Sequence, residues 1–194
     1  MVATLKIYVD TGGSNGSPGT STDTTSLGPP NVRLKTADDP TIDLNNPIPV
    51  PSSSVNNSFW KSCYVLCAVA PNTQVNNLKI YTAGTDFGTG ITTKIGNQFP
   101  TKNHSSSSGY EVATGTVGTS GNDAVTAGYL TSYSNLFSFT SGSPLTGPSI
   151  SEAGGNIVNV NDTSNYFVLQ VIVGTTASPG VQTQKTITVQ YDEI

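Results

Sequence analysis

Charge is scarce in this sequence: Asp, Glu, Lys and Arg make up only 10% of its 194 residues, against roughly 25% in ordinary globular proteins. Surface helices normally carry a polar, charged face, so this scarcity argues against helices. The low charge also excludes the kind of disorder that charge repulsion maintains. Thr, Ser, Asn and Gly take the place of the charged residues, and the chain holds 20 Gly and 12 Pro. We therefore expect a chain built almost entirely of strands and loops.

Clustered basic residues are also missing. The eight Lys and Arg residues stand singly, and the formal net charge is −4. Because phosphate binding needs a basic stripe or patch, the sequence argues against direct contact with nucleic acid. No apolar run approaches the ~18 residues of a membrane-spanning helix, so we expect no membrane contact. The stretch Met1–Ile7 lacks the basic start, apolar run and cleavage site of a signal peptide, which predicts a protein made and kept in the cytoplasm until release.

Cysteine is limited to Cys63 and Cys67. If they share a strand, their Cα atoms stand ~13 Å apart at ~3.3 Å per residue, which is beyond disulfide reach. Both side chains would point to the same face, where we expect them to behave as small buried hydrophobic residues. Two such thiols are too few for a zinc site.

Long apolar and alternating runs are the strongest features present. Tyr166–Val173 and Phe59–Ala70 are almost continuously apolar, which is typical of strands covered on both faces. The run from Lys185 to Ile194 alternates, with Ile187, Val189 and Tyr191 on one face, and predicts a half-buried strand. We expect Tyr166–Val173 to be a central strand and the last run its partner.

Shorter strands are expected between turn-rich loops. They are Leu5–Val9, Leu78–Thr82, Ile91–Ile95, Tyr110–Val117, Leu136–Phe139 and Ile157–Val160, with short alternating pieces at Val32–Leu34 and Ile42–Leu44. Ala124–Tyr133 is the best candidate for a helix, although Gly128 argues against it. No βαβ alternation occurs, so the sequence predicts one antiparallel β-sandwich over residues 1–194. The strand count favours a jelly roll over an immunoglobulin-like sandwich.

Asp10–Pro30 is a low-complexity segment in which Leu27 is the single large apolar residue. Such a segment cannot bury enough surface to fold alone. We expect an extended arm or a long surface loop. The sequence leaves open whether a neighbouring subunit orders it.

Candidates for catalysis are few. His104 is the sole histidine and lies in a segment without a catalytic motif, so we expect an exposed loop residue, not the partner of Cys63 or Cys67. The carboxylates show no spacing that selects an acid–base pair. They are Asp10, Asp23, Asp38, Asp39, Asp43, Asp86, Glu111, Asp123, Glu152, Asp162, Asp192 and Glu193. We assign no catalytic residue and expect a protein that is not an enzyme.

Binding sites for ions and sugars have weak candidates. Asp86 and the stretch Asn159–Asp162 carry the oxygen ligands that calcium prefers, but Asx turns explain the same residues. Tyr81, Phe87 and Phe99 could form an aromatic sugar platform, although roles in the core or as loop anchors fit them better. We therefore assign no metal and no cofactor.

Two segments carry a resemblance to a known group of proteins: Asn77–Ile91, and Val168–Gly180 closing on Ile187–Ile194. They resemble the small Thr- and Gly-rich β-sandwich virion proteins of tailed viruses of bacteria and archaea, which decorate or cement capsids or build tails. The resemblance covers roughly the last two thirds of the chain and leaves out Asp10–Pro30. It implies self-association on a capsid surface and no catalysis.

These observations together predict a non-enzymatic virion structural protein, most specifically a capsid decoration or cement subunit. Its partners would be capsid or tail subunits, reached through flat neutral surfaces and the extended arm. We expect a homo-oligomer, with a trimer as the first guess, located in the virion after synthesis in the host cytoplasm. The alternative is a carbohydrate-binding or adhesive module of a secreted or cell-surface protein. A hydrolase would require His104 or an acid pair in a deep cleft.

Overall fold

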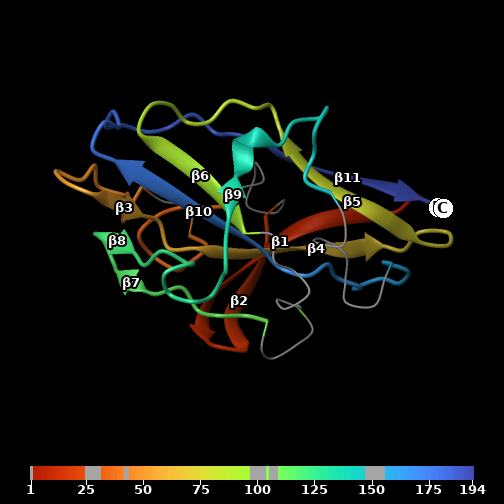
Figure 1. Ribbon diagram of the computed structural model, residues 1–194. Helices are drawn as coiled ribbons and strands as arrows, with labels where there is room; N and C mark the ends of the chain where they lie inside the picture. The colour runs from red at the N-terminus through yellow and green to blue at the C-terminus, as the bar shows by residue number, and fades with distance from the viewer. Residues whose placement is uncertain (1, 25–31, 42–43, 97–103, 105–108, 147–155) are drawn as a thin grey trace.

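The computed structural model describes residues 2–24, 32–41, 44–96, 104, 109–146 and 156–194. Within them the chain is all-β, with one short 3₁₀ helix and no α-helix. The elements are β1 (Thr4–Ser14), β2 (Ser17–Asp23), β3 (Val55–Asn57), β4 (Lys61–Val69), β5 (Val75–Thr82), β6 (Ile91–Gly96), β7 (Gly115–Thr116), β8 (Ser120–Gly121), β9 (Ser134–Asn135), η2 (Leu136–Ser138), β10 (Phe167–Gly174) and β11 (Ile187–Glu193). Figure 1 shows their arrangement.

Strand β10 is the centre of a nine-stranded sheet. Seven strands follow the order β2-β1-β4-β10-β3-β8-β7, and off this path β6 pairs with β10 and β9 pairs with β6. It pairs with β4 through Phe167–Leu169, with β3 through Ile172–Gly174 and with β6 through Val168–Val173. Almost every residue of β10 is buried, as its unbroken apolar run predicts. The expectation of a central strand here is confirmed.

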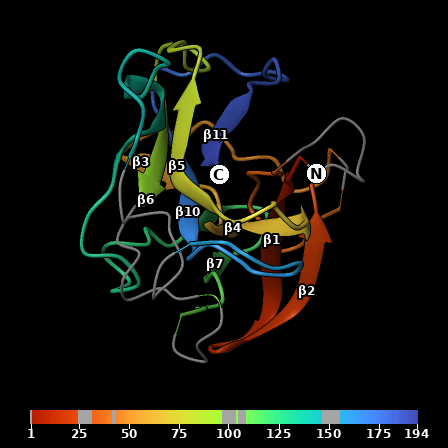
Figure 2. The ribbon, with the colours of Figure 1, turned by 90° about the vertical axis from the view of Figure 1, so that its right-hand side faces the viewer.

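Strands β5 and β11 form a second, two-stranded sheet. Figure 2 shows this pair beside the main sheet. The largest apolar cluster takes Cys63, Ile95 and Phe167 from the main sheet and Ile80 from β5, with Val189 of β11 packed against it. The expected pairing of the last strand with the central strand was wrong, because β11 pairs with β5 in the other sheet.

The low-complexity segment is ordered over its first half, which corrects the expectation of a loop or arm from Asp10. Strand β1 continues to Ser14, and β2 then pairs with it from Ser17 to Asp23. Gly13 makes this hairpin possible: its φ is +77°, and a Cβ there would lie 2.3 Å from the carbonyl oxygen of Ser17. The residues Pro, Gly and Asp of β2 have low β-propensity. The pairing with β1 therefore holds this segment as a strand.

The expected helix at Ala124–Tyr133 is replaced by a capped turn. The Asp123 carboxylate accepts hydrogen bonds from the amides of Val125 and Thr126, which starts one turn. Gly128, with φ +84°, then ends it.

Three expected strands are shorter or of another type. Only Gly115–Thr116 of the run Tyr110–Val117 is a strand, since the amide of Val112 is bound by the Asn15 side chain. Within the run Leu136–Phe139, Leu136–Ser138 forms η2, because the Asn135 side chain caps the Phe137 amide. Of Ile157–Val160, only Ile157 pairs, in an isolated bridge with Val75.

Some expectations fall outside the described residues. They are Thr25–Pro30 of the low-complexity segment, Ile42 and Asp43, Phe99 and Glu152.

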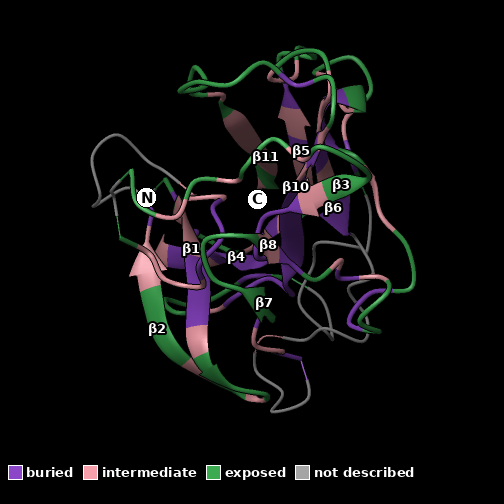
Figure 3. Cartoon of the chain, turned by 90° about the vertical axis from the view of Figure 1, so that its left-hand side faces the viewer, coloured by how far each residue is buried: buried purple, intermediate pink, exposed green. Residues whose placement is uncertain are grey.

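Figure 3 shows burial concentrated in β10, β4 and the middle of β1, while β2 is largely exposed. None of the described helices is long and apolar enough to cross a membrane. All strand pairs of the two sheets are antiparallel, which confirms the all-β class and is consistent with a β-sandwich. The choice between jelly-roll and immunoglobulin-like topology stays a prediction.

Candidate functional site

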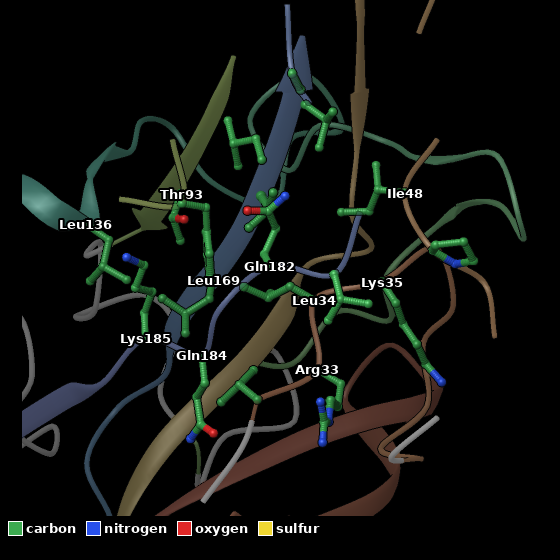
Figure 4. Close-up of a pocket in the computed structure, with 18 of the residues that line it drawn as sticks. Arg33, Leu34, Lys35, Ile48, Thr93, Leu136, Leu169, Gln182, Gln184 and Lys185 are labelled. Atoms are coloured by element: carbon green, nitrogen blue, oxygen red, sulfur yellow. The ribbon is translucent and has the colours of Figure 1, made fainter. Parts of the chain in front are cut away.

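Two places in the structure bring functional groups together: a groove over β10 and a polar cluster around Asp10. The groove, named the β10 groove below, has a volume of about 1080 Å³. Its walls come from β10, β6 and η2, from two irregular segments at residues 32–35 and 44–50, and from the connection at residues 177–187. Figure 4 shows Leu136 and Thr93 on one side, with Ile48 across from them.

The walls of the β10 groove are mainly apolar. Val171 and Val173 of β10 pack with Ala177, and Leu34 and Ile48 of the irregular segments join this cluster. Phe87 and Phe137 meet edge to face with ring centroids 6.0 Å apart and add aromatic surface. The strands build the floor, because β10 alternates apolar residues toward both of its faces.

Cations line the same groove, and the described lining contains no carboxylate. They are Arg33, Lys35 and Lys185. Lys35 is paired, since its Nζ lies 2.9 Å from an oxygen of Asp39. The Nζ of Lys185 lies 6.0 Å from the centre of the Phe87 ring. Arg33 differs, because its Nε is buried and has no hydrogen-bond partner in the described part of the chain.

The second place is a buried cluster around Asp10, which the sequence analysis assigned to the low-complexity segment and which lies within β1. The Asp10 side chain is fully buried and accepts hydrogen bonds from the hydroxyls of Ser21 and Tyr166. Tyr166 meets Tyr64 edge to face, and Tyr110 packs against Tyr166. These contacts join β1 and β2 with the beginning of β10.

His104 belongs to this cluster, which corrects the expectation of an exposed loop residue. Its ring lies 3.9 Å from the Tyr64 ring, centroid to centroid, and its Nδ1 is 3.1 Å from the hydroxyl of Thr163. Its Nε2 stands 3.9 Å from an Asp10 oxygen, too far for a hydrogen bond. Burial lowers the pKa of His104, while the negative charge of Asp10 acts in the opposite direction.

The Asp10 cluster has the composition of an acid–base site, but its carboxylate does not orient the imidazole, because Asp10 lies 3.9 Å from His104 Nε2, beyond hydrogen-bond distance. Nucleophilic catalysis needs a hydroxyl or thiol within hydrogen-bond reach of the base. The Ser21 hydroxyl donates to Asp10, and Thr163 is the described hydroxyl at His104. Cys63 is buried in the apolar core, where burial raises its pKa, so its thiol stays protonated. The arrangement fits a buried polar network that fixes strands.

The calcium candidates bind backbone amides. Asp86 accepts hydrogen bonds from the amides of Phe87 and Thr93 and from the Thr93 hydroxyl. Asp162 accepts from the amides of Val158 and Asn159. Neither pattern is the expected Asx turn, in which the side chain binds the backbone two residues further along, but in both cases backbone amides occupy the carboxylate. Among the described residues, no group of three or more His, Cys, Asp or Glu side chains could hold a metal ion.

Other predicted site residues are dispersed. Phe87 packs against the main core and not on an exposed platform with Tyr81. Asp38 forms a buried ion pair with Lys61, and Asp192 accepts a hydrogen bond from Asn77.

The sequence analysis did not identify Arg33 as a candidate binding residue, because the pattern around it is only a short alternation of apolar and basic residues. Nothing local indicates that its neighbours form a groove.

A comparison of the chain with protein-family models, curated proteins and solved structures found no match. The fold and the two places described above therefore define the class directly: an all-β protein with antiparallel sheets, an apolar groove and a buried polar cluster.

Proposed function

We propose that the chain is a non-enzymatic structural subunit of a virion, a capsid decoration or cement protein that binds neighbouring subunits. The observation that carries this proposal is the β1–β2 hairpin. Its outer strand has the sequence Ser-Pro-Gly-Thr-Ser-Thr-Asp, with charge only at the last residue. Most of its side chains are exposed, and no described strand pairs with its outer edge.

An uncovered strand edge is a surface for adding another strand. Monomeric proteins guard such edges with lysines, prolines or bulges, because a free edge pairs with other chains. In β2, Pro18 lies beside the turn, and Asp23 at the far end is held by Lys6 at 2.7 Å. The middle of the edge is neutral and rich in hydroxyls, which suits main-chain pairing with a partner.

The structure of the Asp10 cluster supports a role without catalysis. Its titratable groups are used to join β1, β2 and β10, as their mutual hydrogen bonds show. A rigid base at the root of the hairpin would hold the β2 edge in a fixed direction, which lowers the entropy cost of docking.

The proposal is tested by assembly. The full chain should form a homo-oligomer in sedimentation experiments, with a trimer expected, and should be found in purified, nuclease-resistant particles from the producing cells. Thr20→Lys places a charge in the middle of the β2 edge and should reduce association at least tenfold, since edge lysines oppose strand addition. Thr126→Lys, at an exposed turn residue, is the matched control.

Two results would contradict the proposal. One is a chain that stays monomeric at all concentrations and is absent from particles. The other is an equal loss of association in the Thr20 and Thr126 variants, which would show that the β2 edge is not part of the interface.

A further inference from the structure

The β10 groove has the size and lining of a small-molecule site. Ligand pockets of proteins span about 300–1,000 Å³ and are lined mostly by apolar side chains with a few polar groups. The β10 groove, at about 1080 Å³, is slightly larger than the upper end of this range. Its apolar surface comes from valine, leucine and phenylalanine side chains of β10, from Ile91 of β6 and from valine, leucine and isoleucine side chains of residues 32–34 and 44–50.

The charge of the groove is opposite to that of the whole protein. The chain has a net charge of −4, yet three of its eight basic residues line this groove and no described Asp or Glu does. Lys35 is neutralised by Asp39, while Arg33 and Lys185 have no carboxylate partner among the described residues. The groove therefore favours an anionic occupant.

Arg33 is the basic side chain of the lining best suited to hold such an occupant. Its Nε is covered by protein atoms and has no acceptor among the described residues, but the side chain as a whole is only partly buried and lines the groove. A guanidinium carries N–H donors besides Nε, and these are the groups that meet an anion in the groove. A carboxylate matches the planar fork of a guanidinium and forms charge-assisted hydrogen bonds with it. In Figure 4, Arg33 extends from the segment that carries Leu34, next to the apolar wall.

We propose that the β10 groove binds a small amphiphile with an apolar body and one anionic head group, of the class of long-chain carboxylates, and that Arg33 binds the head. The apolar walls take the chain, and Lys185 adds a second positive charge at the wall near Leu136. This site is separate from the β2 edge, so it does not depend on the assembly role. A monomeric protein that binds the amphiphile would overturn the proposed function and leave this inference intact.

The test uses the purified, delipidated full chain and palmitate as the probe, measured by titration calorimetry. We expect saturable binding of one palmitate per chain. Hexadecanol, which has the same chain without the charge, should bind at least tenfold more weakly. Hexadecyltrimethylammonium, with a cationic head, should not bind.

Arg33→Gln should weaken palmitate binding roughly 10- to 100-fold, the factor expected for one charge-assisted hydrogen-bonded pair. Lys79→Gln makes the same change of charge on β5, outside the groove, and should leave the affinity within twofold. Arg33→Lys should give an intermediate value, because it keeps the charge and loses the fork. Thermal melting of each variant verifies that it is folded.

Three results would overturn the inference. The first is the absence of saturable palmitate binding, including the case in which a segment of a second copy fills the groove. The second is equal affinity for palmitate and hexadecanol. The third is an equal effect of Arg33→Gln and Lys79→Gln in folded variants.

Discussion

Lys61 and Asp38 form an ion pair inside the protein, with 2.8 Å between Nζ and Oδ1. The Lys61 side chain is 1% exposed and that of Asp38 is 9% exposed. Lys61 also donates to the carbonyl of Ala37 at 3.0 Å, and Asp38 accepts from the amide of Gly12 at 2.8 Å. The pair therefore fastens the irregular segment before β3 to both β1 and β4.

Removing one member of this pair should destabilise the protein by about 3–5 kcal/mol, the usual cost of leaving a buried charge unpaired. Asp38→Asn should cost more than Lys61→Met. Asp38 keeps the Gly12 amide when Lys61 is lost, whereas the more deeply buried Lys61 would retain only the Ala37 carbonyl. Urea denaturation of the two variants measures both the size and the order.

The surface pair Lys6–Asp23 is the matched control. Its Nζ–Oδ2 distance is 2.7 Å, but the Lys6 side chain is 35% exposed. Lys6→Met should have a much smaller effect, because exposed ion pairs are screened by solvent. Equal losses at the buried and exposed pairs would contradict the role given to burial.

Gln170 is a second interior polar link, and its side chain is fully paired. Its Nε2 donates to the carbonyls of Ser58 and Asn122, each at 2.8 Å, and its Oε1 accepts from the amide of Ala124 at 3.1 Å. Gln170→Leu should lower the free energy of unfolding by about 2–4 kcal/mol, since each unpaired buried group costs about 1–3 kcal/mol. Gln190→Leu, at an exposed position of β11, should be nearly neutral in the same urea titration.

Four buried tyrosines should make the fold sensitive to alkali. Burial raises the pKa of Tyr64 to about 12 and raises those of Tyr110, Tyr129 and Tyr166 further, and the negative charge of Asp10 adds to each shift. Above a pH of about 10 the unfolded chain loses these protons while the folded chain keeps them. Stability is therefore complete below about pH 10 and falls as the pH rises through 12.

Tyrosinate absorbance and circular dichroism, followed together from pH 8 to pH 13, measure this effect. The buried tyrosines should ionise only as the fold is lost. Tyr166→Phe should reduce the slope of stability against pH above pH 10, and Tyr81→Phe, outside the cluster, should not. Ionisation of all eight tyrosines near pH 10 in a folded protein would contradict the arrangement around Asp10.

The single histidine, His104, should make stability fall on acidification, whereas the tyrosines make it fall in alkali. Burial lowers the pKa of His104 below its ordinary 6.5. As the pH falls below about 6.5, the unfolded chain binds the proton first, so stability should decline with acidification in that window. The one imidazole signal in a proton NMR titration should have its midpoint below 6.5, and His104→Gln should flatten the pH dependence of stability between pH 6.5 and 5. A midpoint above 6.5 would mean that Asp10 outweighs burial.

The strands that the sequence predicted correctly are those with a long apolar run or a clear alternation of apolar and polar residues. The apolar runs became β4 and β10, and clean alternation became β5 and β11. The partners of β11 could not be predicted, because its choice of β5 depends on residues more than a hundred positions away. Strand β2 was missed because its sequence holds Pro, Gly and Asp, which are depleted in strands, and has no large apolar residue that would show an alternating pattern.

The candidate sites depend on contacts that sequence patterns do not encode. Asp10 and His104 lie far apart in the chain, and Tyr64 and Tyr166 bring them together. The β10 groove combines strand residues with irregular segments that show no periodicity. Arg33 therefore had no local signal, and its unpaired Nε appears only once the fold surrounds it.

Strand β10 leaves the ribosome after β3, β4 and β6, yet all three pair with it. A nascent chain that ends before Phe167 would expose three strand edges at once, at the stage when unpaired edges are most prone to aggregate. Folding of the main sheet must therefore wait until β10 has been synthesised, and any truncation that removes β10 would leave a chain in need of chaperone protection.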